Sequence, residues 1–381
     1  MKGLRIGVVT AEVWPEAAWD LTAWLLRWNS GWAPNVSSRR SVDVGEQGKM
    51  NNLDFGRCAL GICAAAAMLA GCGGSQPPIG APGAMPQTSA PATHADRGKS
   101  WMRSAASAKL LYVSGGTTVE VYAFPQGELV GTLTGFQRAA GDCTDRAGNV
   151  FITDEFAGTI SKYPHGGTIP TLTLSNVGRS PYGCSVEPKS GDLAVVSFGS
   201  SPTGGVFIYK KAKRSVTEFA DPSIYNYYYC SYDNKGNLFV EGSSYLHQDV
   251  GLLAELPKGG TEFQTVTLDE GFSPGGGVQW DGTDLALESP SGKHNAEGPT
   301  VIDRVQISGS TGMMTTPIYL STGKSNQNPG VGTQFWIDGN SIVKQEYTSR
   351  GVGRWRYPAG GKVVSTFKEH ASFGLTISAA K

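Results

Sequence analysis

Residues 141–174 read GDCTDRAGNVFITDEFAGTISKYPHGGTIPTLTL, and this stretch contains every part of a unit that the chain repeats. It has a first strand, a turn with Asp145 and Gly148, a strand rich in β-branched residues, a loop, an amphipathic strand and a glycine-rich turn. Asp and Gly favour tight turns, which join short strands. The stretch therefore predicts a small antiparallel unit of four strands.

The unit recurs along the chain at a nearly constant period. Its first turn is marked by an acidic residue at Asp145, Glu187, Asp233, Asp281 and Asp338, at spacings of 42, 46, 48 and 57 residues. A Pro-x-Gly turn follows the third strand at Pro125, Pro164, Pro257 and Pro358. Both markers indicate six units of ~40–50 residues, the length of one β-propeller blade. We therefore expect an all-β fold for residues 109–381, a six-bladed β-propeller of four-stranded blades.

The two ends of this region complement each other. The first unit, which begins at Lys109, lacks a first strand, and the chain ends in an unpartnered one, Ser372–Ser378. Propellers generally avoid open strand edges by pairing such ends. We expect the C-terminal strand to pair into the first blade and close the ring. The 52 Gly, 21 Pro and 17% charged residues also suit many short strands joined by turns.

The repeat resembles a known family of propellers. Residues 145–154 read DRAGNVFITD, which is similar to the run of the NHL-repeat and gluconolactonase-like six-bladed propellers. The resemblance implies an architecture and not one activity, because propellers serve both as enzymes and as binding proteins. In gluconolactonase-like enzymes a Glu, an Asn and an Asp hold a divalent cation at the channel mouth. The only analogues here are Asp154, Glu155 and Asn326. We therefore predict no cofactor and keep a bound divalent cation as an alternative.

Three cysteines belong to the repeats. We place Cys143, Cys184 and Cys230 at equivalent positions of three first strands, where Val278 and Phe335 stand in other units. A cysteine that alternates with apolar residues acts as a small hydrophobe. Equivalent positions of neighbouring blades are too far apart for the ~6 Å Cα separation of a disulfide. We therefore expect free, buried thiols.

The segment before the repeats resembles the leader of a bacterial lipoprotein. Arg57 precedes an apolar run that ends in Leu69-Ala70-Gly71-Cys72, similar to a lipobox. The resemblance implies cleavage before Cys72 and lipidation of its sulfur. We interpret residues 1–49 as an upstream mis-start or disordered extension, 50–72 as the signal peptide and 73–108 as a Pro-, Ala-, Gly- and Ser-rich tether.

This organisation predicts where the protein works and what it meets. A lipid anchor would hold it in the cell envelope, on the periplasmic or cell-surface side. With 32 Lys and Arg against 32 Asp and Glu, the chain has no basic surplus for nucleic acid. We expect a monomer that contacts the membrane through its lipid anchor.

The candidate site lies where loops between second and third strands, and loops between blades, gather around the channel. Polar groups that converge on a concave surface are typical of a ligand site. The candidate ligand-binding residues are Arg138, Asp154, Arg179, Tyr225, Tyr227, His247, His294, Asn326 and Arg350. In the run 225–229 we assign Tyr228 and Tyr229 to packing and leave Tyr225 and Tyr227 open between packing and ligand contact.

No catalytic residue can be assigned. The chain has no G-x-S-x-G nucleophile elbow, and its loop histidines His247 and His294 have no partner pair in the sequence. We therefore expect an extracytoplasmic propeller that binds a small molecule, glycan or protein through its channel mouth. The alternatives are a metal-dependent hydrolase or lyase of gluconolactonase-like type and a scaffold for envelope assembly.

Overall fold

The computed structural model describes residues 99–103, 108–175, 180–199, 204–288, 300–321, 333–346, 351–368 and 373–380. The chain divides into two compact units, Met1–Pro86 and Gln87–Lys381, and all described residues belong to the second. Cys72, the predicted leader and most of the predicted tether lie outside the described residues. Across the described ranges the only helix is the 3-10 turn η2 (Lys210–Ala212), and no helix there has the length and apolar character that crossing a membrane requires.

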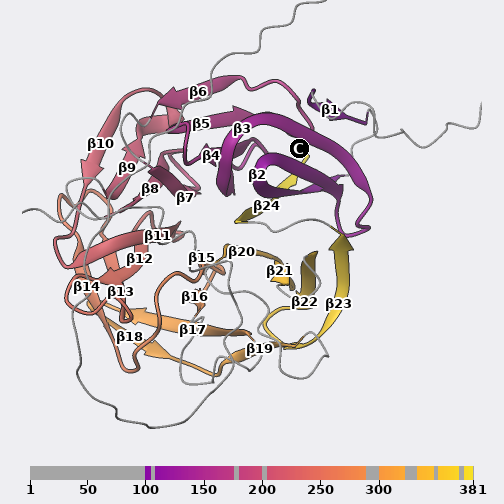
Figure 1. The fold of residues 1–381 in the computed structure, drawn as a ribbon. Helices are drawn as coiled ribbons and strands as arrows, with labels where there is room; N and C mark the ends of the chain where they lie inside the picture. Colours follow the sequence, from indigo (N-terminus) through magenta and orange to yellow (C-terminus); the bar gives the residue numbers. More distant parts are fainter. Residues whose placement is uncertain are drawn as a thin grey trace, which may run out of the picture. The chain divides into compact units, whose positions relative to one another are not determined.

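The second unit is built from antiparallel strands that follow one another around a common centre (Figure 1). The first sheet has the order β24-β2-β3-β4-β5-β6, and β1 pairs with β3. Its strands are β1 Trp101–Met102, β2 Lys109–Ala123, β3 Leu129–Thr144, β4 Val150–Asp154, β5 Thr159–Tyr163, β6 Leu172–Ser175 and β24 Gly374–Ala379. β1 therefore orders two residues of the segment predicted to be a flexible tether, with Trp101 opposite Thr132.

The second sheet has the order β10-β9-β8-β7. Its strands are β7 Ser180–Val186, β8 Leu193–Phe198, β9 Gly205–Tyr209 and β10 Val216–Phe219. Each strand pairs antiparallel with the next along the chain. This sheet is one complete copy of the four-stranded unit that the sequence predicts.

The third sheet joins three further copies through their outer strands. Its first strands are β11 Ile224–Tyr232, β12 Leu238–Ser244, β13 Gly251–Leu256, β14 Gln264–Leu268, β15 Val278–Trp280, β16 Leu285–Glu288 and β17 Thr300–Ser308. Its remaining strands are β18 Thr311–Met314, β19 Ile318–Ser321, β20 Phe335–Asp338, β21 Ser341–Glu346, β22 Gly351–Arg356 and β23 Gly360–Lys368. Parallel pairs β14–β18 and β19–β23 link the copies.

The innermost strands contact one another in succession. β3 contacts β7, β7 contacts β11, β11 contacts β15, β15 contacts β20, β20 contacts β24, and β24 contacts β3. β24 also pairs antiparallel with the start of β2, from Ser114 opposite Gly374 to Lys109 opposite Ala379. In Figure 1 the strands β7, β11, β15 and β24 lie toward the centre, whereas β6, β10, β14 and β23 lie toward the rim.

The apolar core is divided among the interfaces between successive sheets. Leu193 and Val195 of β8, for example, pack with Phe151 of β4, and Leu285 and Leu287 of β16 pack with residues of β11 and β12. Two tryptophans pack within this core. Trp355 is fully buried, and Trp336 is half-buried between two of the clusters.

One position of the inner strands links a repeat to the next repeat at four places. It lies two residues before the turn acid, at Cys143, Ser185, Ser231 and Gln279. Ser185 Oγ accepts a hydrogen bond from Tyr232 N at 3.0 Å, and Ser231 Oγ accepts one from Trp280 N at 2.8 Å. Gln279 Oε1 accepts from Ile337 N at 2.7 Å. The repeat therefore carries a polar link at equivalent places of successive junctions.

The prediction of free cysteines was wrong at the first of these junctions. Cys143 and Cys184 form a disulfide, with their Cα atoms 5.7 Å apart. Cys184 stands three residues before its turn acid Glu187, whereas Cys143 stands two residues before Asp145. A shift of one residue turns a strand side chain to the opposite face, so Cys143 points toward the next sheet while Cys184 points back. Cys230 remains a buried free thiol, as predicted.

Candidate functional site

The starts of the inner strands approach closely because glycines stand where they meet. A Cβ atom on Gly141 of β3 would overlap Tyr182 O of β7, and one on Gly374 of β24 would overlap Ala140 O of β3. A side chain at either position would force the strands apart. These glycines allow side chains from several sheets to converge beside the inner strands.

Arg138 of β3 is held between two phenylalanine rings at this end. Its guanidinium carbon lies 5.0 Å from the ring centre of Phe156 and 4.7 Å from that of Phe373, both within range of a cation–π contact. Its Nε lies 3.2 Å from Glu155 Oε2. Phe156 is 63% exposed, whereas Phe373 is half-buried. We call these four residues the arginine clamp.

Asp154 places the backbone that carries Arg138. Its two carboxylate oxygens accept hydrogen bonds from Gln137 N and Arg138 N, each at 2.8 Å. Asp154 Oδ1 also accepts one from Ala157 N at 3.3 Å. Because both oxygens accept from backbone donors, Asp154 holds the backbone at Arg138 in place.

Glu155 is buried beside this arginine. Burial raises the pKa of the Glu155 carboxyl, and the nearby Arg138 guanidinium partly offsets that rise. The Glu155 Oε2–Arg138 Nε contact lacks hydrogen-bond geometry, so Oε2 accepts no hydrogen bond from the described residues. The pair is therefore an electrostatic contact that leaves hydrogen-bonding capacity on both partners.

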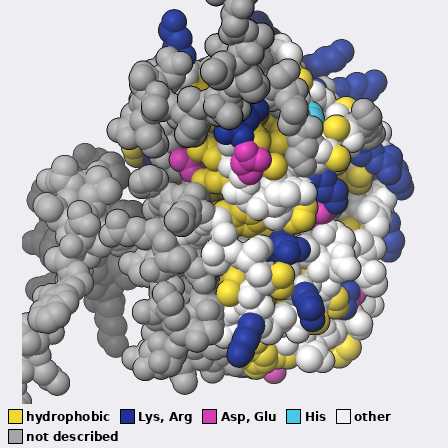
Figure 2. Space-filling model, turned by 90° about the vertical axis from the view of Figure 1, so that its right-hand side faces the viewer, with side chains coloured by type: hydrophobic (Ala, Val, Ile, Leu, Met, Phe, Trp, Pro, Cys, Tyr) yellow, Lys and Arg dark blue, Asp and Glu magenta, His cyan; other side chains and the backbone are white. Residues whose placement is uncertain are grey.

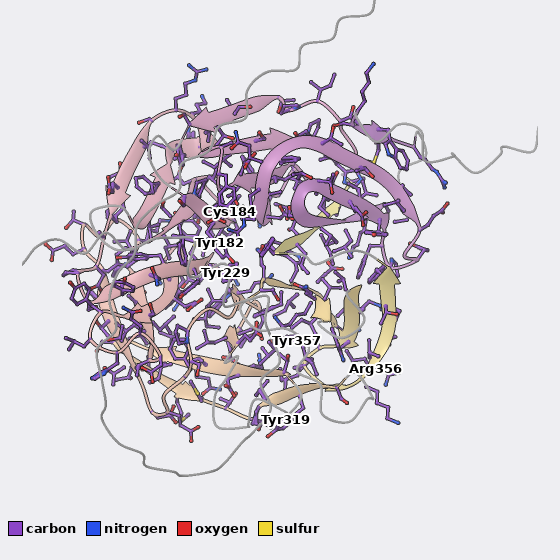
Figure 3. All side chains as sticks on the ribbon, in the orientation of Figure 1. Tyr182, Cys184, Tyr229, Tyr319, Arg356 and Tyr357 are labelled. Atoms are coloured by element: carbon purple, nitrogen blue, oxygen red, sulfur yellow. A yellow bond between two sulfur atoms is a disulfide. The ribbon has the colours of Figure 1, made fainter. Side chains whose placement is uncertain are left out.

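Four aromatic residues continue from the clamp along the inner strands. The ring centres of Tyr182 and Tyr229 are 5.4 Å apart, those of Tyr182 and Phe198 are 5.9 Å apart, and those of Phe198 and Tyr228 are 5.5 Å apart. Tyr229 Oη donates to Phe373 O at 3.3 Å, which joins this aromatic strip to the clamp. Figure 3 shows Tyr182 and Tyr229 next to each other near the centre. Desolvation raises the pKa of Tyr182 to about 12, so its hydroxyl stays protonated.

A second ion pair lies fully buried among β16, β20 and β21. Lys344 Nζ donates to Glu288 Oε2 at 2.7 Å, to Thr333 Oγ1 at 2.9 Å and to Thr333 O at 3.2 Å. Both charged side chains are 0% exposed. Burial raises the pKa of Glu288, and Lys344 partly offsets this effect. All three donor sites of the Lys344 ammonium are used within the protein, whereas the buried Glu288 Oε1 accepts no hydrogen bond from the described residues.

Two more buried carboxyls lie in this polar interior. Asp142 Oδ1 accepts from Ser114 Oγ at 2.7 Å, and desolvation raises the pKa of Asp142 to about 7. Gln334 holds the Asp142 backbone, because its Oε1 accepts from Asp142 N and its Nε2 donates to Asp142 O. Desolvation also raises the pKa of Glu241 well above its usual range. Burial thus favours the neutral form of these two acids.

We expected Tyr225 and Tyr227 on a loop near the channel. Both lie instead within strand β11. Tyr227 is fully buried, and its Oη accepts from Asp221 N at 2.6 Å and donates to Asp221 O at 2.9 Å. It is a packing residue, and the ligand-contact interpretation of Tyr227 was wrong. Tyr225 is half-buried, with its ring centre 5.8 Å from that of the exposed Tyr245.

The other candidates fall into two groups. His247 is exposed on the turn after β12, and its backbone N lies 3.4 Å from Ser244 Oγ. The remaining candidates lie outside the described residues, namely Arg179, His294, Asn326 and Arg350. Of the predicted ligand residues in the described ranges, Arg138 and Asp154 come together through a backbone hydrogen bond. Tyr225, Tyr227 and His247 instead belong to β11 and the turn after β12.

The candidate metal ligands do not fit a divalent cation. Both Asp154 oxygens accept backbone hydrogen bonds, and Glu155 lies against the positive charge of Arg138, which would repel a metal. Asn326 is outside the described residues. No group of three or more His, Cys, Asp or Glu side chains in the described ranges is placed to hold a metal ion.

Sequence reasoning missed the phenylalanines of the clamp and two members of the strip, Tyr182 and Phe198. One signal was available for Phe156, because it directly follows the Asp154-Glu155 end of β4, where a polar turn residue is expected. Phe373 had no such signal, since its contact with Arg138 joins opposite ends of the chain.

One face of the described part of the molecule shows how its charged side chains are distributed. Figure 2 shows one side of the molecule, where Lys and Arg side chains are scattered among neutral ones rather than gathered in one patch. The balance of 32 basic and 32 acidic residues agrees with this view. Long basic stripes are the usual mark of a nucleic-acid surface.

The comparisons identify a fold and no family. A chain from the crystal structure of a nidogen/laminin complex is 15% identical, with a TM-score of 0.56 over 72% of this chain and 99% of that one. A protein of unknown function from Bacteroides caccae is 13% identical, with a TM-score of 0.51 over 71% and 98%. No family model matches the chain, and no curated protein matches it. These likenesses support a β-propeller-like fold.

Proposed function

We propose that the folded region is a six-bladed propeller that binds a ligand at the arginine clamp and the aromatic strip, without catalysing a reaction on it. The succession of contacts from β3 through β7, β11, β15 and β20 to β24 supports six blades. The pairing of β24 with β2 supports a ring that is closed by the C-terminal strand. Ring closure would leave no open strand edge at the centre.

The observation that carries the binding function is the exposure of Phe156 beside a charged partner. Phe156 is 63% exposed, and one face of its ring is covered by Arg138. Aromatic and arginine side chains are the residues most often found at the energetic centre of binding sites. Tyr228 and Phe198 of the aromatic strip are half-buried and pack against each other. A ligand that covers Phe156 would remove apolar area from water.

The disulfide and the leader support a location outside the cytoplasm. Disulfides persist in oxidising compartments, and Cys143–Cys184 joins two sheets of the fold. The apolar run that ends at Cys72 fits export and lipidation. We propose a domain tethered in the cell envelope by a lipid on Cys72. Loss of radioactive palmitate incorporation in Cys72→Ser is the expected result, and continued labelling would contradict the anchor.

The binding function can be tested with a defined panel of small neutral sugars, acidic sugars and short peptides. We expect at least one compound to bind the purified domain in isothermal titration calorimetry and to lose at least tenfold in affinity in Phe156→Ala. Ile169→Ala is the matched control, because Ile169 is 76% exposed and takes no part in the clamp. Absence of binding across the panel, or equal affinity in both variants, would favour the scaffold function. Turnover of a bound compound would instead favour the hydrolase or lyase alternative.

A further inference from the structure

The guanidinium group of Arg138 is only partly used by the protein. Its Nε faces Glu155 Oε2, but neither Nη atom donates a hydrogen bond to any described residue. The side chain is 28% exposed, so part of it is in contact with solvent. Most buried or half-buried arginines complete their five donor sites with protein or water. The Nη groups of Arg138 are therefore donors that the described residues leave unused.

The position of this group is fixed before any ligand arrives. Phe156 and Phe373 contact the guanidinium at 5.0 and 4.7 Å, and Asp154 holds the backbone nitrogen of Arg138. Each of these contacts limits the rotamers of a side chain that would otherwise be mobile. A planar guanidinium with two free parallel N–H groups matches the two oxygens of a carboxylate. Preorganisation lowers the entropy lost on binding.

We propose that the ligand is an acidic sugar whose ring carboxylate accepts two hydrogen bonds from the Nη atoms of Arg138. This inference rests on the proposed binding function and names its ligand class. The saturated ring next to the carboxylate lies against Phe156, whose exposed area needs an apolar C–H face.

The hydrogen-bonding groups around the clamp favour an acceptor ligand over a donor. The Glu155 carboxyl is buried against Arg138. The Asp154 carboxylate accepts hydrogen bonds from the backbone and is also buried. The group left for a ligand at the half-exposed side of the clamp is therefore the Arg138 guanidinium, which offers donors.

The test uses trimers of galacturonate, mannuronate and guluronate, each compared with its methyl ester in isothermal titration calorimetry. Esterification removes the negative charge of the carboxylate and its pair of equivalent acceptor oxygens, while the sugar ring is unchanged. We expect at least one acid to bind at least tenfold more tightly than its ester. Arg138→Gln should remove this difference, and Arg138→Lys should reduce it, because an ammonium cannot offer the planar pair of donors. Arg146→Gln is the control, since Arg146 is an exposed arginine on the turn before β4.

Three outcomes would overturn the ligand class. Equal binding of acid and ester would show that the carboxylate is not recognised. Full displacement of the acid by inorganic phosphate at equal concentration would indicate a general anion site. Binding of a neutral sugar or a peptide that depends on Phe156 but not on Arg138 would contradict the acidic sugar while the binding function stands. If no compound of either panel binds, the binding function fails as well. Melting curves of each variant show whether a loss of affinity reflects unfolding.

Discussion

The molecule contains two ion pairs of opposite character near its inner strands. Lys344 and Glu288 are fully buried at 2.7 Å, and Thr333 completes the lysine. Arg138 and Glu155 approach to 3.2 Å, and the arginine is 28% exposed while the glutamate is buried. In the first pair every donor of the lysine is used and neither side chain reaches solvent. In the second pair the arginine reaches solvent and its Nη groups donate to no described residue. The comparison therefore distinguishes a structural centre from a candidate binding surface.

Breaking the buried pair should have the largest effect. Lys344→Met leaves the Glu288 carboxylate without its cation in a site with no solvent access, which typically costs ~3–5 kcal/mol. We expect a drop of this size in the free energy of unfolding measured with urea. The double variant Lys344→Met with Glu288→Leu should recover much of the loss, because no buried charge remains. A loss below ~1 kcal/mol for Lys344→Met would show that this pair resembles the exposed one.

The disulfide provides the next largest effect and lies in the half of the molecule that carries the clamp. Cys143 and Cys184 are 41 residues apart, and a cross-link that closes such a loop stabilises by up to ~4 kcal/mol in the chain-entropy account. We expect Cys143→Ala with Cys184→Ala to lose ~2–4 kcal/mol in urea unfolding. Reductant should destabilise the wild-type protein and leave this variant unchanged. If reductant has no effect on the wild type, the junction is held by packing alone.

A pH series tests whether the closed interior is kept neutral. Burial raises the pKa of Asp142 from 3.8 to about 7, so between these values the folded state binds a proton that the unfolded state has lost. This contribution to stability is complete below pH ~4, declines as pH rises toward 7, and is lost above it, with a slope on the order of 1 kcal/mol per pH unit. Asp142→Asn should remove the decline. Parallel pH profiles for wild type and Asp142→Asn between pH 5 and 7.5 would mean that Asp142 is ionised in the fold.

Much of the fold was predictable, because residues that favour turns mark each repeat in the sequence. Asp145 and Asp233 each bond to backbone nitrogens of their own turn, as their place in the sequence predicts. The cysteine error had a simple cause, since aligning residues by type concealed a one-residue shift that the turn acids reveal. Six blades and ring closure stay predictions that the strand contacts support.

The candidate site was harder to predict because its contacts join distant parts of the chain. Arg138 was selected as a loop residue near the channel, but its partner Phe373 lies on the far end of the chain, next to β24. No local pattern reports such a contact. Tyr227 is not available to a ligand for a different reason, because its hydroxyl forms hydrogen bonds with the backbone of the nearby Asp221. Exposure and unused donors, which decide whether a residue binds a ligand, depend on the folded surroundings.

The smallest expected effect belongs to the Arg138–Glu155 pair and is the sharpest test of the comparison. Arg138→Gln removes an ion pair whose arginine is 28% exposed, so solvent screens its charge more than that of the fully buried pair. The two ring contacts that are also lost contribute ~0.5–1 kcal/mol each. We therefore expect the urea midpoint of Arg138→Gln to stay close to that of the wild type, while Lys344→Met shifts it strongly. A large shift for Arg138→Gln would mean that the clamp holds β3 and β24 together and that its free donors are incidental. Near-wild-type stability instead means that the protein keeps a preorganised arginine at its surface without needing it to fold, which is the behaviour expected of a residue retained for binding.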